Sequence, residues 1–240
     1  MKFTNQKTWE DSFKEQIENA SYNTAPVDMI VRNVSYFLRA RYQAEQLKDL
    51  KFLEVGCGGG VNLSWLARKG VNISGIDISK KALALAKDRL ESENLLYDTL
   101  AHACATQMPF DNNHFTGVVE SCVIQHIEAE ARRRAFSEIY RILKPEGVFV
   151  GHMLDRDCTA FQGQLTETGS VIFEDPNKPK FYLTNIGYAH FFSEEELREA
   201  FKDFSVIDLS KVKFDLPKEE AKRRGYDQYT QSMWSVYAIK

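Results

Sequence analysis

Short apolar runs alternate with amphipathic helical patterns along the first 150 residues of this 240-residue chain. Three runs predicted to be strands lie at 51–55, 71–76 and 115–124, each short and rich in apolar or β-branched residues. Helical spacing separates the first two runs, at 61–69, and follows the second, at 80–90. Parallel strands need a crossover between them, so this alternation predicts a parallel sheet with helices on both faces.

The rest of the chain continues this pattern and then adds one helix and two strands. A helix after residue 130 is expected to break at 144–147, where a proline and a glycine precede the next strand. Residues 193–196 have the spacing of a capping box, which predicts a helix that runs to Phe204. Two late strands are expected near 206–214 and 233–239.

No repeat, low-complexity run or flexible linker divides the chain, so we expect a single domain over residues 1–240. Two segments lie outside the alternating core. Residues 1–47 include a helical pattern that starts at Pro26. Residues 155–192 show no clear periodicity but hold seven aromatic residues, more than a solvent-facing loop carries.

Composition and charge exclude several classes of protein. The 31 Lys and Arg residues and 34 Asp and Glu residues leave a net charge of −3, so no nucleic-acid partner is expected. No stretch without charged residues exceeds thirteen, well short of the roughly 20 residues that span a bilayer. The amino terminus has no apolar signal segment, which predicts a cytoplasmic protein without a membrane partner. Four scattered cysteines and five histidines without metal-ligand spacing predict neither disulfides nor a metal site.

A glycine cluster at 56–60 closes the first predicted strand. A dinucleotide fingerprint would need its third glycine where this chain has Val61, and the Gly-Lys-Ser/Thr of a P-loop is missing. Glu54, two residues before the cluster, would repel a pyrophosphate but attract a cation. S-adenosylmethionine carries an ammonium and a sulfonium, and glycines permit close backbone approach to it. A tight turn without a ligand is the alternative interpretation.

A second carboxylate ends the next predicted strand, about 20 residues after the glycine cluster. Asp77 lies where an acidic side chain in such folds accepts the hydroxyls of a ribose. The alternative is that Asp77 only caps the following helix, which begins after Ser79. Glu54 and Asp77 together predict a site for a cationic nucleoside at the carboxyl ends of the strands.

Four segments in this order resemble the class I S-adenosylmethionine-dependent methyltransferases: 52–60, 75–79, 108–110 and 141–147. The likeness covers residues 48–154 tightly and is greatest to the members that act on small molecules. It implies an α/β, Rossmann-like, doubly wound sheet of seven strands, mostly parallel with the last strand antiparallel and helices on both faces. It also implies S-adenosyl-L-methionine as cofactor, S-adenosyl-L-homocysteine as product, and transfer of a methyl group to an O or N atom of a small-molecule metabolite by in-line displacement.

The resemblance assigns cofactor-binding roles position by position. The residues after the first strand hold the methionine end, Asp77 holds the ribose, and Ile78 lies against the adenine. Family members often have an adenine-binding Asp where this chain has Cys104, so the adenine contact is expected to shift to the backbone of Ala105 or to Thr106. The cofactor-binding residues expected in this way are Glu54, Gly56, Cys57, Gly58, Asp77, Ile78, Ala105, Thr106, Glu120, whose backbone faces the methionine, and Arg32, whose alternative is a surface charge.

The segment after the fourth strand faces the transferred methyl group in the resembled family. His126 is the candidate general base there, because an imidazole titrates near pH 6.5; its alternative is a packing role under the next helix. The residues expected to bind substrate are Gln125, His152, Tyr182 and His190. By the same resemblance, residues 1–47 form a helical cap and residues 155–192 a substrate lid that shapes the acceptor pocket.

Two other functions remain open from the sequence. One is a methyltransferase that acts on a protein or RNA group. The other is a subunit or sensor that binds S-adenosylmethionine without transferring its methyl group, which the missing adenine-binding Asp and the uncertain base suggest. Neither the methyl acceptor nor the oligomeric state can be predicted from the sequence.

Overall fold

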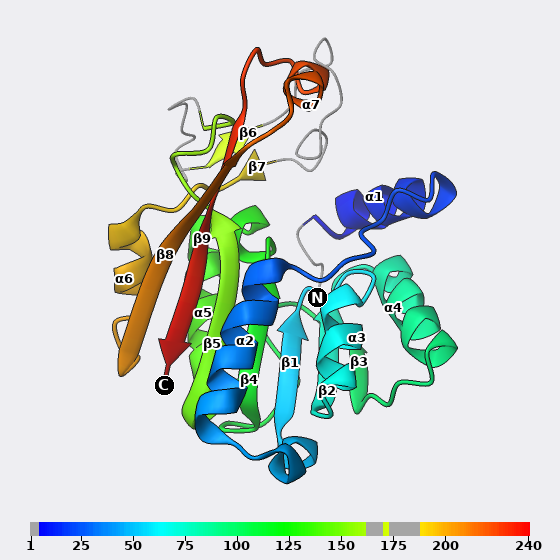
Figure 1. Ribbon diagram of the computed structural model, residues 1–240, viewed down its shortest axis with the longest axis vertical. Helices are drawn as coiled ribbons and strands as arrows, with labels where there is room; N and C mark the ends of the chain where they lie inside the picture. The colour runs from blue at the N-terminus through cyan, green and yellow to red at the C-terminus, as the bar shows by residue number, and fades with distance from the viewer. Residues whose placement is uncertain (1–4, 162–169, 173–187) are drawn as a thin grey trace.

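The computed structural model describes residues 5–161, 170–172 and 188–240. Seven strands form one sheet in the order β3-β2-β1-β4-β5-β9-β8 (Figure 1). A further pair, β6 and β7, forms a small separate sheet. The strands are β1 (Lys51–Val55), β2 (Asn72–Asp77), β3 (Thr99–His102), β4 (Phe115–Ser121), β5 (Leu143–Leu154), β6 (Val171–Ile172), β7 (Tyr188–Ala189), β8 (Val206–Asp215) and β9 (Thr230–Ile239).

The strand directions confirm the predicted sheet. Strands β1 to β5 pair in parallel, whereas β9 runs antiparallel to both β5 and β8. Because β9 lies between β5 and β8, the last strand of the chain is inserted into the sheet and not added at its edge. The carboxyl ends of β1, β2, β4 and β5 therefore meet at one edge, where loops that are distant in sequence come together.

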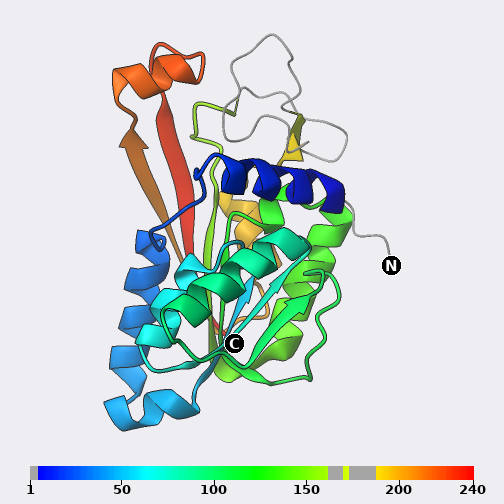
Figure 2. The ribbon, with the colours of Figure 1, turned by 90° about the vertical axis from the view of Figure 1, so that its right-hand side faces the viewer.

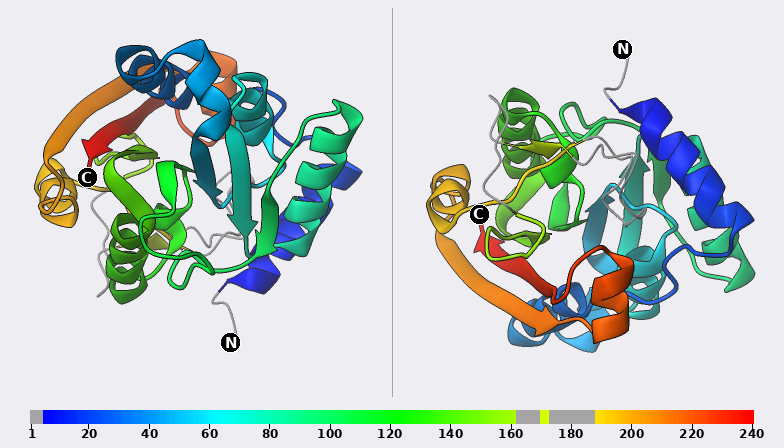
Figure 3. Two further views of the ribbon diagram at one scale, coloured as in Figure 1. Left: turned by 90° about the horizontal axis from the view of Figure 1, so that it is seen from below. Right: turned by 90° about the horizontal axis from the view of Figure 1, so that it is seen from above.

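Helices cover both faces of the sheet (Figure 3). Apolar side chains of α2, α3 and α4 pack with those of β1, β4 and β5 on one face, and those of α5 and α6 pack on the other. Among the described residues, no helix is long and apolar enough to cross a bilayer. The helices are α1 (Gln6–Glu18), α2 (Asp28–Arg41), α3 (Val61–Arg68), α4 (Lys80–Ser92), α5 (Ala129–Ile142), α6 (Glu194–Ala200) and α7 (Lys218–Arg223), with 3-10 turns η1 (Ala44–Asp49) and η2 (Ile124–His126).

The two helices of the amino-terminal 47 residues lie in different places. Helix α2 buries Ile30, Val34, Phe37 and Leu38, which share one stripe, against the sheet. Burial of each of these side chains contributes roughly 1.5–3 kcal/mol, so α2 belongs to the core layer. Helix α1 has no fully buried residue and lies across the carboxyl-terminal edge of the sheet (Figure 2).

Two boundaries differ from the sequence prediction. No loop separates α5 from β5 at 144–147, because the strand begins at Leu143, which pairs with Phe115. The turn residues form an irregularity inside β5, where Glu146 has a positive φ of 63° and its N–H donates to the carbonyl of Lys240. Helix α6 keeps the predicted capping box but ends at Ala200.

Candidate active site

The glycine turn after β1 is held in a conformation that other residues rarely adopt. Gly56, Gly58 and Gly60 have φ values of 65°, 50° and 76°. A Cβ at Gly56 would lie 2.2 Å from Cγ2 of Val123, in the turn that follows β4. The turns after β1 and β4 therefore approach each other too closely for any side chain at Gly56.

A pocket opens above this turn, and we group its lining residues by the strands that they follow. The β1–β2 half is lined by residues from 54–59, 76–78 and 103–106, and the β4–β5 half by residues from 121–128 together with His152. Residues of α1 line both halves. The predicted site residues that line the pocket are Glu54, Gly56, Cys57, Gly58, Asp77, Ile78, Ala105, Thr106, Gln125, His126 and His152.

Glu54 brings a buried carboxylate with a spare oxygen into the β1–β2 half. Its side chain is buried, Oε1 accepts a hydrogen bond from Nδ2 of Asn62 at 2.7 Å, and Oε2 has no partner in the described part of the chain. Burial raises the pKa of Glu54 to about 8, and the charges of Asp77 and Glu120 add to this rise. Oε2 is sealed from solvent in this structure, so a cation reaches it only if the groups above it move aside. An ammonium bound there would reverse the rise in pKa, so the chemistry of this carboxylate fits the ammonium of S-adenosylmethionine.

Asp77 is buried at the end of β2 and holds two backbone groups in place. Oδ2 accepts from the N–H of Gly58 at 3.0 Å, and Oδ1 accepts from the N–H of Ser79 at 2.8 Å. Burial raises the pKa of Asp77, although these N–H groups oppose the rise. Each carboxylate oxygen retains a second lone pair, which leaves room for a ribose hydroxyl. Asp77 thus supports the glycine turn and the start of α4 while it lines the pocket.

The segment after β3 completes the β1–β2 half. Sγ of Cys104 lies 3.1 Å from Oγ1 of Thr106, so these two side chains satisfy each other across the buried Ala105. A thiol is a weak hydrogen-bonding group compared with a carboxylate. Cys104 is therefore a weaker acceptor than the Asp expected there, and Ala105 and Thr106 line the pocket beside it.

Two buried side chains of η2 line the β4–β5 half. Oε1 of Gln125 accepts the N–H of Leu154 at 2.8 Å, and its Nε2 lies 3.2 Å from Nε2 of His126. The ring of Trp9, from α1, meets the His126 ring edge to face at 5.4 Å between centroids. Both predicted residues thus face the pocket, but the amide oxygen of Gln125 is already occupied.

His152, at the end of β5, is the other imidazole of the β4–β5 half. It pairs with Ser121 in β4 and with Ser235 in β9, so the three side chains share one face of the sheet. Its Nδ1 is sealed from solvent without a partner among the described residues. Burial lowers the pKa of His152 to about 4, which makes the ring neutral at physiological pH.

The comparisons with known proteins agree with this geometry. Residues 53–151 match a family model described as a methyltransferase domain. A ubiquinone biosynthesis O-methyltransferase of Pelagibacter ubique is 27% identical over 107 residues, which are 45% of this chain and 44% of that protein. An uncharacterized protein of Haemophilus influenzae is 33% identical over 107 residues, 44% of this chain and 43% of that protein. The matches therefore span less than half the length of these curated relatives.

Solved structures extend the likeness to the whole fold. An S-adenosylmethionine-dependent methyltransferase of Anabaena variabilis has a TM-score of 0.61 at 18% identity and covers 100% of this chain and 96% of its own. One of Methanosarcina mazei has a TM-score of 0.60 at 21% identity, covering 79% of this chain and 92% of its own. Residues 53–151 thus match a methyltransferase domain, and the chain shares the fold of these solved structures. Those solved proteins are named as dependent on S-adenosylmethionine, the cofactor that the sequence predicts here.

Three predicted site residues do not line the pocket, and a fourth lies outside the described residues. Arg32 is exposed on the solvent side of α2 and pairs with Asp28 at 2.7 Å, which corrects the expectation that it reaches the cofactor. Tyr182 lies outside the described residues. The other two, Glu120 and His190, are buried elsewhere.

Glu120 and His190 support the pocket from behind. Oε1 of Glu120 accepts the N–H groups of Val123 and Ile124, so the carboxylate shapes the turn after β4 and does not face the pocket. Burial raises the pKa of Glu120 to about 7. His190 lies 3.2 Å from Glu196 in α6, and its N–H donates to the carbonyl of Gln125. The backbone of His190 therefore holds η2 in place, while its ring pairs with Glu196.

Polar residues that the sequence prediction missed attach α1 over the pocket. Glu10 accepts from Oγ of Ser79 at 3.1 Å and from the N–H of Lys80 at 2.6 Å, at the start of α4. At the other side of the pocket, Nδ2 of Asn5 donates to the carbonyl of His126. Glu10 and its partners are about 70 residues apart in sequence, so no local motif indicates the contact.

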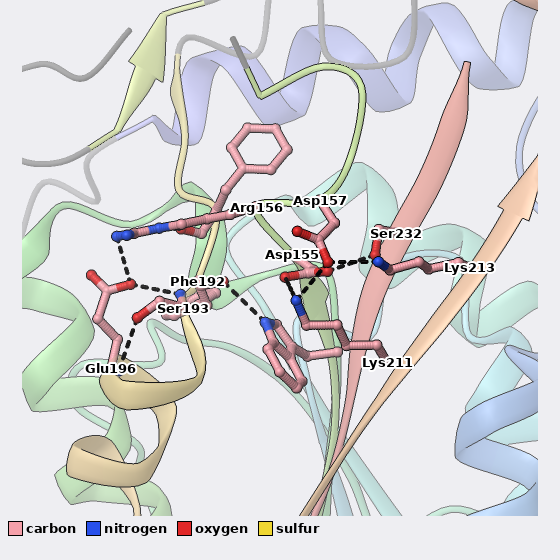
Figure 4. A network of polar contacts seen from close by, with 11 residues as sticks. Asp155, Arg156, Asp157, Phe192, Ser193, Glu196, Lys211, Lys213 and Ser232 are labelled. Atoms are coloured by element: carbon pink, nitrogen blue, oxygen red, sulfur yellow. Dashed lines mark hydrogen bonds and ion pairs between the residues drawn. The ribbon is translucent and has the colours of Figure 1, made fainter. Parts of the chain in front are cut away.

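A polar network secures the end of β5 just beyond His152 (Figure 4). Oδ2 of Asp155 accepts from Oγ of Ser232 in β9 at 2.6 Å, and Lys211 in β8 lies 3.2 Å from Oδ1 of Asp155. Lys211 also pairs with Asp157 at 2.7 Å. Arg156 pairs with Glu196 of α6 at 3.0 Å. The network fixes β5 to β9, β8 and α6, and with them the position of His152.

Proposed function

We propose that this protein transfers a methyl group from S-adenosylmethionine to an oxygen or nitrogen atom of a small-molecule metabolite. The observation that carries the proposal is the partnerless Oε2 of Glu54 in the β1–β2 half. A buried carboxylate oxygen without a partner is costly unless a cation binds it, and the methionine end of the cofactor carries an ammonium. The methyltransferase domain match and the family's cofactor support the same conclusion.

Different residues of the β1–β2 half would bind different parts of the cofactor. Glu54 and the backbone of the glycine turn would hold the methionine end, and Asp77 the ribose hydroxyls. Ile78, Ala105 and Thr106 would surround the adenine. When bound, the cofactor supplies a methyl group on a positively charged sulfur, which is activated enough for alignment and exclusion of water to give much of the acceleration.

A small acceptor is favoured by the way α1 covers the pocket. Its contacts with α4 on one side and η2 on the other place α1 over a pocket in which residues of α1 and η2 face each other. Relatives named as ubiquinone biosynthesis O-methyltransferases support a hydroxyl among the possible acceptors. We propose further that α1, the part of residues 1–47 that lies over the pocket, and the segment 155–192 determine which metabolite is accepted.

We propose that the protein is located in the cytoplasm. We also propose that residues 1–240 form a single domain. Support for a reducing compartment comes from the cysteines, all four of which are free thiols. The cysteines in the pocket need no disulfide to hold the site, because the glycine turn is fixed by the N–H of Cys57 donating to the carbonyl of Ile76.

Calorimetry with S-adenosylmethionine and S-adenosylhomocysteine is the first test. We expect one molecule of either compound to bind per chain. If Glu54 also interacts with the positive charge on the sulfur, Glu54→Gln should weaken the binding of S-adenosylmethionine more than that of S-adenosylhomocysteine. Absence of binding by either compound would contradict the proposed function and the sensor alternative together.

Labelled methyl transfer into cell extracts then separates the enzyme from its alternatives. Protein saturated with cofactor labelled in the methyl group is incubated with an extract divided into small-molecule, RNA and protein fractions. We expect label in the small-molecule fraction. Label in RNA or protein only would favour a polymer substrate, and binding without transfer to any fraction would favour a sensor.

A further inference from the structure

The two imidazoles of the β4–β5 half differ in how their nitrogens are used. His126 lies in η2 and His152 at the end of β5, and both line the pocket. Either ring could serve a methyl acceptor by residue type alone. Their hydrogen bonds distinguish them.

The lone pair of His126 Nε2 is engaged by a neighbour. Oε1 of Gln125 accepts the backbone N–H of Leu154, and only the amide oxygen can do so, which fixes the orientation of the amide. The Nε2 group of Gln125 therefore donates to Nε2 of His126 at 3.2 Å. A neutral His126 then carries its proton on Nδ1, with the nitrogen that would act as a base already in use.

The His152 ring has no such partner. Nδ1 is sealed from solvent and unpaired among the described residues, and Nε2 has no hydrogen bond to any of them either. Because the ring lines the pocket and Nδ1 is sealed, Nε2 is the nitrogen that remains to meet a ligand. A ring nitrogen that borders a pocket and has no protein partner among the described residues is able to accept a hydrogen bond from a ligand.

We propose that His152 Nε2 accepts the hydrogen bond of the methyl acceptor and takes its proton, while His126 is a positioning residue that Gln125 holds against α1. This inference rests on the proposed function. The acceptor class it requires carries a proton on the reacting atom, such as a hydroxyl or an uncharged N–H. As that atom gains its bond to the methyl carbon, the carbon–sulfur bond breaks with its electron pair left on sulfur. The acceptor's proton passes to His152, which becomes imidazolium and later releases it to water.

The neighbours of His152 suit this role. Ser121 and Ser235, its partners in β4 and β9, are uncharged, and Oγ of Ser235 accepts from Asn33 of α2 at 2.8 Å. Burial lowers the pKa of the ring to about 4, which keeps its lone pair available at physiological pH and makes the imidazolium formed in the transfer strongly acidic, so that it gives up its proton to water readily. The Asp155 network anchors the strand immediately after it (Figure 4).

The first test compares variants in the labelled-methyl assay. His152→Phe keeps an aromatic ring but removes the lone pair, so the transfer rate should fall roughly 100-fold, as for loss of a general base. Cofactor affinity should stay within about threefold. His114→Phe, at the opposite edge of the sheet, is the matched control and should retain the wild-type rate. Full activity of His152→Phe would overturn the inference, whereas an inactive wild-type protein that binds cofactor would overturn the proposed function instead.

Nuclear magnetic resonance of ¹⁵N-labelled histidines tests the inference without turnover. In the complex with S-adenosylhomocysteine, His126 should show a protonated Nδ1 and an unprotonated, hydrogen-bonded Nε2. Phenol, which donates a hydrogen bond, should shift the ring signal of His152, and anisole, which has no O–H, should not. A phenol-dependent shift at His126 in place of His152, or no shift at His152 up to saturating phenol, would overturn the assignment.

Discussion

The two halves of the pocket are constructed from sequence in different ways. In the β1–β2 half, Glu54 and Asp77 end consecutive strands of one βαβ unit, and Asn62, which orients Glu54, is eight residues away. In the β4–β5 half, His152 meets Ser121 only through strand pairing, and Trp9 reaches His126 from the far end of the chain. The first half is local and the second is assembled by the fold.

This difference separates two functions within one pocket. A half made from adjacent segments keeps its geometry when loops elsewhere change, which suits a cofactor common to a family. A half made from η2, β5 and α1 changes whenever one of these elements shifts, which suits a substrate that varies. We therefore expect variants of the two halves to affect cofactor binding and methyl transfer separately.

Gly56→Ala should have the largest effect, because Gly56 is where the two halves touch. An alanine with a left-handed backbone conformation lowers the stability of the fold by about 1 kcal/mol. A Cβ placed 2.2 Å from Val123 requires repacking that costs roughly 1–3 kcal/mol more. Denaturant unfolding should show a loss of about 2–4 kcal/mol. Gly70→Ala is the control, since Gly70 also has a positive φ of 86° but no atom within 4 Å of the added carbon. Equal losses in both variants would mean that the two turns move apart freely.

Glu54→Gln should reduce affinity for S-adenosylmethionine by about 2–3 kcal/mol, roughly 30- to 150-fold, because a charged hydrogen bond to the ammonium is lost. The matched control is Glu120→Gln, which alters another buried carboxylate that faces the turn and not the pocket. Calorimetry should find the control within threefold of the wild type. Similar losses in the two variants would place Glu120 in the cofactor site after all.

The raised pKa of Glu54 also predicts a pH dependence. Below its pKa of about 8 the carboxyl of the ligand-free protein is mostly protonated, and binding of the cation must release that proton. Affinity should therefore rise between pH 6 and 8 by at most about tenfold per pH unit. The ligand-free protein should lose stability as pH rises from 4.5 toward 8, since the folded state binds the proton more tightly. Glu54→Gln should remove both trends in calorimetry and thermal unfolding.

Asp77→Ala should weaken cofactor binding by about 1.5–2 kcal/mol through loss of hydrogen bonds to the ribose. Ser79→Ala tests the alternative that Asp77 acts only as a cap, because Ser79 is the N-cap whose Oγ accepts from Ala82. Its removal should lower stability by about 1 kcal/mol and leave affinity within a few-fold. If the two variants bind cofactor equally well, Asp77 has no ribose role.

Sequence patterns could predict the β1–β2 half because its chemistry follows the strand order. The strands at 51–55 and 206–214, the Ser79 cap and the capping box at 193–196 all appear in the structure. Local spacing determines each of these features. The same holds for Glu54 and Asp77, which end neighbouring parallel strands and therefore meet at one edge.

Residues whose roles depend on orientation or distant contacts could not be predicted in this way. Arg32 is two residues after the buried Ile30, about 200° around the helix, so it faces solvent. His190 is adjacent to aromatic residues in sequence, yet its ring pairs with Glu196 and its backbone N–H donates to the carbonyl of Gln125. The carboxylate of Glu10 reaches α4 only because α1 crosses the sheet edge.

Glu10→Gln should have the smallest effect, and this effect should extend to both halves of the pocket. Glu10 is the α1 carboxylate at the positive end of α4, and replacing it with a neutral amide should weaken the docking of α1 by about 1 kcal/mol. Since α1 has no fully buried residue, this loss should speed amide hydrogen exchange in α1 and cofactor dissociation by about fivefold each. Glu18→Gln, whose side chain is exposed and pairs only loosely with Lys14, is the control and should change neither rate. Faster amide exchange in α1 without faster cofactor dissociation would show that α1 covers the β4–β5 half alone. If both rates increase, α1 is the element through which a bound acceptor retains the cofactor.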